Sequence, residues 1–287
     1  MLTLRQQGAD IFIPDATDRP DALARTTHLG VGAHQDDLEI LAYHGILECF
    51  GRADRWFTGV TCTNGGGSSR TGVYADYTDD DMVRVRREEQ RTAAAIGRYA
   101  AVLQLDYPSA VIKNPAQPAV SEDLYDTLLA TRPSVIYSHN PADKHDTHLA
   151  VLTALLAALQ RMDPSERPDK LYGCEVWRDL DWMPDAHKVV FDVSGRDHLA
   201  AALLGVFDSQ IAGGKRYDLA AIGRRVAHAT YLESHGVDTG NAMIFAVDLT
   251  SVMNGTETLE SYVGDLLDRF RGDVIEKLSR VKRRDTP

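Results

Sequence analysis

Short apolar runs alternate along the chain with longer segments in which apolar residues recur every three or four positions. The apolar runs, which predict buried strands, lie at 28–33, 56–63, 101–106 and 134–139. The segments with helical spacing lie near 37–51, 81–97, 121–131 and 147–162. Strands that alternate with helices favour an α/β fold, in which a Rossmann-like, mostly parallel sheet carries helices on both faces.

The second half of the sequence predicts a smaller α+β part. Strand-like segments lie at 170–177, 188–193 and 242–249, and helices are expected near 196–208 and 216–234. The tail from 256 to 284 predicts an amphipathic helix, because its apolar residues follow helical spacing. We expect that helix to pack on its own domain, with a homo-oligomer contact as the alternative.

The domain organisation follows from the absence of an internal repeat or a clear linker in the sequence. We therefore interpret 1–287 as a single domain, with a core at about 28–165 and a C-terminal part at about 166–287.

Composition narrows the possible partners. Lys and Arg number 31 against 42 Asp and Glu, which gives a net charge of −11. Such an acidic chain is a poor candidate for binding nucleic acid or an anionic membrane surface, and a neutral or cationic small substrate suits it better. No stretch approaches the roughly 18 apolar residues of a membrane span. The start lacks a signal-peptide pattern and the three cysteines are widely spaced, so we expect a cytoplasmic protein with reduced thiols.

Two polar stretches follow predicted strands. The first, "VGAHQDDLE" at 31–39, places His34 before the adjacent carboxylates of Asp36 and Asp37. The second, "HNPADKHDTH", covers 139–148. Adjacent carboxylates repel each other, and a bound cation is one way to neutralise them. Imidazole and carboxylate ligands suit zinc, and three protein ligands leave one position open for a reactive water.

These two stretches resemble motifs of a known family. His34-Gln35-Asp36-Asp37-Leu38-Glu39 is similar to the A-H-P-D-D-x-E motif of the PIG-L/LmbE-like metal-dependent de-N-acetylases, and His145-Asp146-Thr147-His148 is similar to their H-P-D-H. Between them, the family's R-x-x-E-x-x-x-A-x-x-x-G helix is matched by Arg86, Glu89, Ala93 and Gly97. The likeness runs from about Gly30 to Ser234.

The resemblance implies a zinc hydrolase that removes an acetyl group from an N-acetylated amino sugar or a related conjugate. By matching position, the metal ligands would be His34, Asp37 and His148, with Fe²⁺ as another possible metal. Asp36 would be the general base, and His145 would assist the oxyanion and protonate the leaving amine.

Two positions depart from the family pattern. Gln35 replaces the usual proline, which changes a turn but removes no ligand. Thr147 stands where the family has the aspartate that orients the catalytic histidine. We therefore expect Asp143 or Asp146 to orient the ring of His145 instead.

Other polar residues have weaker assignments. Glu39 is expected to support the ligand residues without taking part in the reaction. Arg70, in the glycine-rich loop after the second strand, is a candidate substrate contact. His139 is left out of the metal set, because it can simply end its strand.

Three other functions remain to be compared with deacetylation. A dinucleotide-dependent oxidoreductase is suggested by Gly30-x-Gly32, but the third glycine is missing and the two acids would repel a pyrophosphate. A non-catalytic metal- or sugar-binding module has no use for a spare base at Asp36. An amidase that acts on a larger acyl group of a thiol-sugar or antibiotic conjugate would use the same site.

Overall fold

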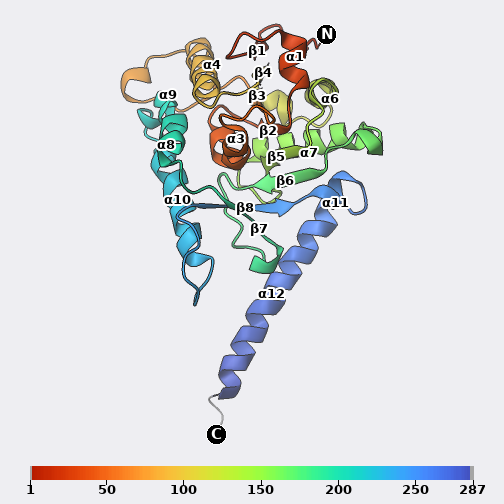
Figure 1. Cartoon of the computed structure of the whole chain (residues 1–287), viewed down its shortest axis with the longest axis vertical. Coiled ribbons are helices and arrows are strands. Elements are labelled where there is room, and N and C mark those ends of the chain that lie inside the picture. Colours follow the sequence, from red (N-terminus) through yellow and green to blue (C-terminus); the bar gives the residue numbers. More distant parts are fainter. Residues whose placement is uncertain (1, 285–287) are drawn as a thin grey trace.

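The computed structural model describes residues 2–284 and contains an eight-stranded sheet at its centre (Figure 1). Its strands are β1 (Asp10–Phe12), β2 (His28–Gly32), β3 (Phe57–Thr63), β4 (Ala101–Tyr107), β5 (Val135–His139), β6 (Lys170–Cys174), β7 (Val189–Asp192) and β8 (Met243–Asp248). Their order is β1-β4-β3-β2-β5-β6-β8-β7. Neighbours from β4 to β6 pair in parallel, whereas β1 and β8 join antiparallel. This arrangement confirms the predicted α/β fold with a mostly parallel sheet.

The described residues form twelve α-helices, several of which cover the two faces of this sheet. They are α1 (Arg19–Ala24), α2 (Asp37–Leu41), α3 (Tyr43–Cys49), α4 (Asp79–Ile96), α5 (Ser109–Ile112), α6 (Ala119–Thr131), α7 (Asp146–Arg161), α8 (Asp197–Gly205), α9 (Asp208–Ile211), α10 (Tyr217–Tyr231), α11 (Thr250–Met253) and α12 (Leu259–Arg284). Apolar residues of α6 and α7 pack on one face, and those of α2, α3, α4 and α8 pack on the other. Because both faces are covered, every residue of the central strand β3 is buried, rather than every second one.

The strand order creates a topological switch point between β2 and β5. From β2 the chain builds outward through β3 and β4, and it then returns to place β5 on the other side of β2. The loops that follow β2 and β5 therefore diverge and leave a crevice at the carboxyl ends of these strands. Both His/Asp-rich stretches of the sequence lie in these two loops.

Two glycines of β2 explain the spacing that resembled a dinucleotide-binding motif. A Cβ on Gly30 would lie 2.7 Å from the Phe57 ring, and one on Gly32 would lie 2.9 Å from the Cβ of Asp37. Both glycines therefore serve the close packing of β2 against its neighbours, rather than a phosphate-binding turn.

Several local predictions need correction. The helix predicted over 37–51 is two short helices, α2 and α3, separated at Ala42. The edge strand β1 and the short helix α1 were not predicted, because three- to six-residue elements carry too little periodicity. The C-terminal strands β6, β8 and β7 extend the same sheet as the core strands, which supports the proposal of a single domain.

Helix α12 was predicted correctly as a helix, but the expectation that it packs along its own domain is wrong for most of its length. Leu259 and Tyr262 contact the core, and Leu266 is only 3% exposed. Further along, Leu278 is 58% and Val281 is 61% exposed. Figure 1 shows α12 extending away from the rest of the chain.

A membrane-crossing helix is not found within 2–284, since none of the helices there combines the required length with enough apolar character.

Candidate metal centre and active site

Three side chains bring potential metal-ligating atoms together at the switch point. Nδ1 of His34 lies 3.2 Å from Nε2 of His148, and Oδ2 of Asp37 lies 3.4 Å and 3.5 Å from these two nitrogens. His34 and Asp37 come from the turn after β2, and His148 comes from the first turn of α7. The structure thus gathers the three residues that the resemblance assigned to the metal.

The size of this triangle fits a tetrahedral metal ion. Bonds of about 2.0–2.1 Å from Zn²⁺ to nitrogen and oxygen place neighbouring ligand atoms about 3.3–3.4 Å apart. The three observed separations lie within 0.2 Å of that range, and Asp37 and His148 are almost fully buried. Burial opposes ionisation of Asp37, but the nearby histidines outweigh it and hold its pKa well below the usual value. These residues therefore fit a divalent cation.

Asp143 orients His148, not His145, which corrects the sequence-based expectation. Its Oδ1 lies 3.4 Å from Nδ1 of His148, on the side of the ring that faces away from Asp37. The same carboxylate accepts hydrogen bonds from the backbone N–H groups of His145 and Trp177. A carboxylate behind a metal-ligating histidine fixes the tautomer of the ring and raises its basicity. Burial lowers the pKa of His148, but Asp37 and Asp143 raise it overall.

His139 lies beside this centre, but the ring nitrogen nearest to Asp37 already accepts a hydrogen bond. Its Nε2 accepts a hydrogen bond of 2.9 Å from the backbone N–H of Ala33, so that lone pair is not free for a metal. Burial, and then the proximity of His148, lower the pKa of His139 far below the usual value, so the ring is neutral. Its structural role is to tie the ends of β5 and β2 together.

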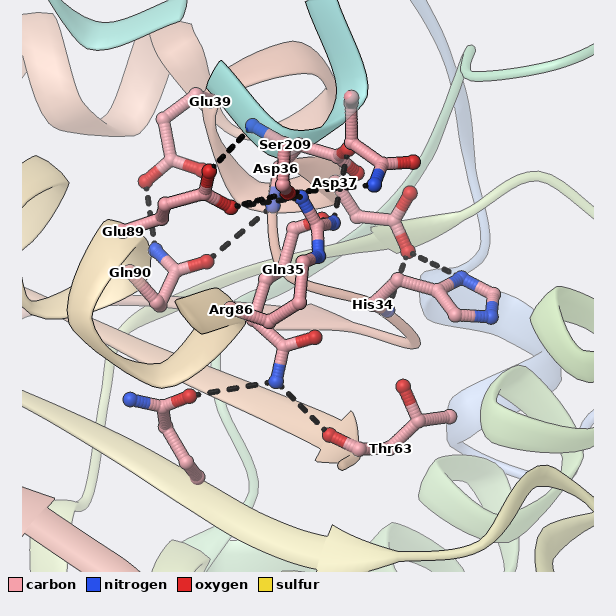
Figure 2. Close-up of polar contacts among 12 residues, drawn as sticks. His34, Gln35, Asp36, Asp37, Glu39, Thr63, Arg86, Glu89, Gln90 and Ser209 are labelled. Atoms are coloured by element: carbon pink, nitrogen blue, oxygen red, sulfur yellow. Dashed lines mark hydrogen bonds and ion pairs between the residues drawn. The ribbon is translucent and has the colours of Figure 1, made fainter. Parts of the chain in front are cut away.

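Asp36 is a buried carboxylate held beside the triangle by an arginine. Its Oδ2 lies 3.0 Å from Nη2 of Arg86, and Figure 2 shows Arg86 between Asp36 and Glu89. Burial raises the pKa of Asp36, Arg86 lowers it and Asp37 raises it again, with a result of about 6. A carboxylate with this pKa is ionised at neutral pH yet still basic enough to accept a proton.

The backbone of Asp36 is unusual as well. Its φ of +88° lies in the left-handed region, which Asp tolerates better than most residues. Asp36 stands at the N-cap position of α2, but its side chain makes no capping hydrogen bond. Backbone strain of this kind is typical of functional turns.

A buried polar network supports Asp36 from behind. The backbone N–H of Asp36 donates to Oε1 of Gln90, and Nε2 of Gln90 donates to Glu39 over 2.9 Å. Tyr99 donates its hydroxyl proton to the same Glu39 oxygen. Burial raises the pKa of Glu39 to about 7. Glu39 therefore lies behind the site and does not reach the pocket.

His145 lies at the N-terminus of α7, and its ring is oriented by backbone rather than by a carboxylate. Its Nδ1 accepts a hydrogen bond of 3.3 Å from the backbone N–H of Thr147, which leaves the ring proton on Nε2. Its ring centroid lies 4.9 Å from that of His34. Burial, then His148 and His34, lower the pKa of His145. Asp146, the other expected partner, is exposed at the surface.

These groups lie in a pocket of about 570 Å³. Asp36, Asp37, His34 and His145 line its floor, and Trp177 and Tyr217 form an aromatic wall. The pocket lining also includes Lys113 and Lys215, for which no ion pair is found among residues 2–284, and Arg224, whose charge lowers the pKa of the neighbouring Glu175. The hydroxyls of Thr63 and Thr147, which also line it, are buried without a hydrogen-bond partner in that same range. The pocket thus offers unpaired donors to a polar ligand.

Residues 29–159 match the PIG-L family, described as GlcNAc-PI de-N-acetylase. This segment is a PIG-L domain. It contains both His/Asp-rich loops, Arg86 and α7 as far as Leu159, so the three potential metal ligands lie within the family match.

Solved structures share the fold over more than three quarters of this chain. The conserved protein TT1542 from Thermus thermophilus is 18% identical with a TM-score of 0.61, over 78% of this chain and 94% of that one. GalB, the 4-carboxy-2-hydroxymuconate hydratase from Pseudomonas putida, is 17% identical with a TM-score of 0.60, over 78% and 96%. N,N'-diacetylchitobiose deacetylase from Pyrococcus horikoshii is 14% identical with a TM-score of 0.59, over 77% and 83%. At these identities the likeness establishes the fold alone. No curated protein matches the sequence.

Arg70 of the PIG-L domain is placed away from the pocket lining, unlike the sequence-based expectation. Its guanidinium donates to the backbone oxygens of Gly66 and Tyr77 and pairs with Asp79. Arg70 therefore fixes the glycine-rich loop. The residues of this loop that line the pocket are Gly65, Gly67, Ser68 and Ser69.

Sequence reasoning assigned no role to several residues of the site. The sequence placed Arg86 and Glu89 in a family motif, but only the structure reveals them as a buried pair that also holds Ser209. Trp177 and Lys215 lie in segments without a motif, and they reach the pocket only through the fold.

Proposed function

We propose that this protein is a metal-dependent hydrolase that removes an N-acetyl group from an amino sugar or an amino-sugar conjugate. The observation that carries the proposal is the triangle of His34, Asp37 and His148, whose edges fit a tetrahedral cation, beside the buried base Asp36. The PIG-L match supports the hydrolytic deacetylase class.

Zn²⁺ is the proposed metal, with Fe²⁺ as the alternative that the same ligands accept. A divalent ion held by His34, Asp37 and His148 would polarise the amide carbonyl and make a water more acidic. Asp36 removes a proton from the attacking water, whose oxygen bonds to the acyl carbon. Asp36 then returns that proton to the nitrogen as the carbon–nitrogen bond breaks, and acetate and the free amine leave.

His145 stabilises the oxyanion as a neutral hydrogen-bond donor in this proposal. The backbone N–H of Thr147 occupies Nδ1, so Nε2–H is the group that can donate into the pocket. Protonation of Nδ1 would break that hydrogen bond and place a cation at the positive end of α7. We therefore assign the proton delivered to the amine to Asp36 rather than to His145, which changes the role that the family resemblance implied.

The substrate is proposed to carry an anionic group. Lys113 and Lys215 line the pocket without an ion pair in 2–284, and Arg224 adds a third cation beside Glu175, so the pocket favours a carboxylate or phosphate on the substrate. The net charge of the whole chain pointed to a neutral or cationic substrate, but the charge of the pocket is the more direct guide. The three cysteines are free and buried, which suits the reducing cytoplasm.

A hydratase that acts on a carboxylated substrate is the second candidate. GalB, a hydratase, shares this fold, and the basic pocket lining would suit carboxylates. The same metal ligands and base would then add water to a carbon–carbon double bond. Amidase activity on a larger acyl group, and metal or sugar binding without turnover, are two further outcomes of the same test.

The test combines metal analysis with product detection. The purified protein is loaded with Zn²⁺ or Fe²⁺, and acetate release is measured on N-acetylglucosamine, its 1-phosphate and N,N'-diacetylchitobiose. Asp36→Asn is the control variant, because Asn tolerates the left-handed backbone and is isosteric. We expect one metal ion per chain, acetate release by the wild type, and a loss of turnover of at least about 100-fold in the variant.

Each contrary outcome has a distinct meaning. A wild type without stoichiometric metal refutes the metal-dependent assignment. Metal binding without acetate release, together with hydration of a carboxylated diene, favours the hydratase. Near-normal turnover by Asp36→Asn removes Asp36 from the role of base.

A further inference from the structure

Helix α12 leaves the domain with an apolar stripe in which Val263 and Phe270 are partly buried and the other four residues are exposed within 2–284. The stripe consists of Val263, Leu267, Phe270, Val274, Leu278 and Val281. Leu267, Val274, Leu278 and Val281 are 46%, 38%, 58% and 61% exposed. The residues repeat at intervals of three and four along 26 residues of helix, so they lie on one face of a rod about 39 Å long.

We propose that α12 pairs antiparallel with α12 of a second copy of this chain and forms a homodimer. The stripe is self-complementary when it is reversed. Val263 then meets Val281 of the other copy, Leu267 meets Leu278, and Phe270 meets Val274, so each contact pairs the first half of one helix with the second half of the other. A two-fold axis between Phe270 and Val274 generates every contact twice, as an isologous interface requires.

The charges on α12 favour the same direction. From 259 to 268 the helix carries three acidic residues and no basic ones. From 269 to 284 it carries seven basic and two acidic residues. An antiparallel pair places the acidic half of each helix along the basic half of the other, whereas a parallel pair places like charges together.

The position of α12 on the domain leaves room for this arrangement. Only Leu259, Tyr262 and Leu266 of its first turns contact the core, and they point to a neighbouring side of the helix. The rest extends away from the domain in Figure 1. The two antiparallel domains then lie at opposite ends of the paired helices, and their pockets stay open.

The first experiment measures mass by sedimentation of the full-length protein up to about 100 μM, where a contact of micromolar affinity is saturated. Two charge variants are compared with the wild type: Glu260→Lys with Asp268→Lys, and Lys277→Glu with Arg280→Glu. We expect a wild-type dimer and a rise in the dissociation constant of at least tenfold for each variant alone. A 1:1 mixture of the two variants, and the single chain that carries all four changes, should dimerise again.

The second experiment uses disulfide trapping to determine whether the two α12 helices run antiparallel or parallel. The three native cysteines are buried, so they should not cross-link. A mixture of Val263→Cys and Val281→Cys chains should cross-link, and Val281→Cys alone should not. Cross-linking of Val281→Cys alone would mean a parallel pair and overturn the proposal. A wild type that stays monomeric at the highest concentration also overturns it, and α12-dependent binding of that monomer to anionic vesicles would identify a membrane surface as the occupant instead.

Discussion

Replacement of Arg86 by methionine tests the electrostatic design of the site directly. Arg86 is 1% exposed and donates to Asp36, Glu89 and the backbone oxygen of Gln35. Methionine fills much of the same volume but leaves two carboxylates and a carbonyl in the interior without their cation. Removal of one partner of a buried ion pair costs about 3–5 kcal/mol. We expect the free energy of unfolding of Arg86→Met to fall by about that amount.

The same variant should change the pH dependence of activity. Burial and Asp37 raise the pKa of Asp36, and Arg86 is the strongest of the groups that lower it, with a result of about 6. Without Arg86 this pKa rises further, so less of Asp36 is ionised at neutral pH. Turnover at pH 7 should fall, and the acid limb of the pH–rate profile should move to higher pH. Arg86→Lys, which keeps the charge but not the planar donor set, should give an intermediate profile.

The assays are urea unfolding of the metal-free protein and acetate release between pH 5 and 9. Arg87→Met is the matched control, because Arg87 is the next residue and also pairs with an acid. Its Nη2 lies 3.0 Å from Oδ1 of Asp106, and 26% of the Arg87 side chain is exposed. We expect a smaller loss for that control than for Arg86→Met, because the Arg87–Asp106 pair is partly exposed to solvent, although Arg87 also donates to the backbone oxygen of Gly8. A similar small change for Arg86→Met, or an unmoved acid limb, would contradict the role assigned to Arg86.

Three further predictions concern the metal centre, the buried carboxyl group of Glu175 just after β6, and the pocket lining. Asp143→Asn should weaken metal affinity by about 10- to 100-fold in chelator competition, while Asp146→Asn should leave it unchanged; equal effects would refute the assignment of Asp143. Burial raises the pKa of Glu175 from 4.5 to about 8. Below pH 4.5 the carboxyl is neutral in both the folded and the unfolded chain and costs no stability. As the pH rises from 4.5 to 8 only the unfolded chain ionises, so the free energy of unfolding falls. Glu175→Gln escapes that loss and should be up to about 3 kcal/mol more stable than the wild type at pH 7 in urea unfolding, with no advantage at pH 4. Lys113→Gln with Lys215→Gln should lower kcat/KM about tenfold for the 1-phosphate of N-acetylglucosamine and little for the neutral sugar, and a uniform effect on both would argue against an anionic substrate.

The predicted fold and the predicted ligands rest on different kinds of information. The alternation of β2, β3, β4 and β5 with helices could be read from the sequence, because burial of both sheet faces imposes apolar runs on each strand. The break at Ala42 could not, since apolar spacing continues across it from α2 into α3.

The site was partly accessible to sequence reasoning. His34, Asp37 and His148 were found because each sits in a short motif at the end of a strand. The role of Asp143 was assigned to the wrong histidine, because Asp143 lies two residues from His145 and five from His148, and the sequence favoured the nearer ring. Only the geometry of the loop after β5 shows which ring its carboxylate meets.

The sequence by itself determined the class of fold, the two ligand loops and the helical nature of α12, because periodicity and motif spacing are local properties of the chain. The tertiary structure decided which residues share a pocket. Arg86, Trp177 and Lys215 come from distant segments, and no local pattern encodes the distance between them. It also decided that the apolar face of α12 is left uncovered, since burial depends on where the rest of the chain ends up rather than on the helix itself.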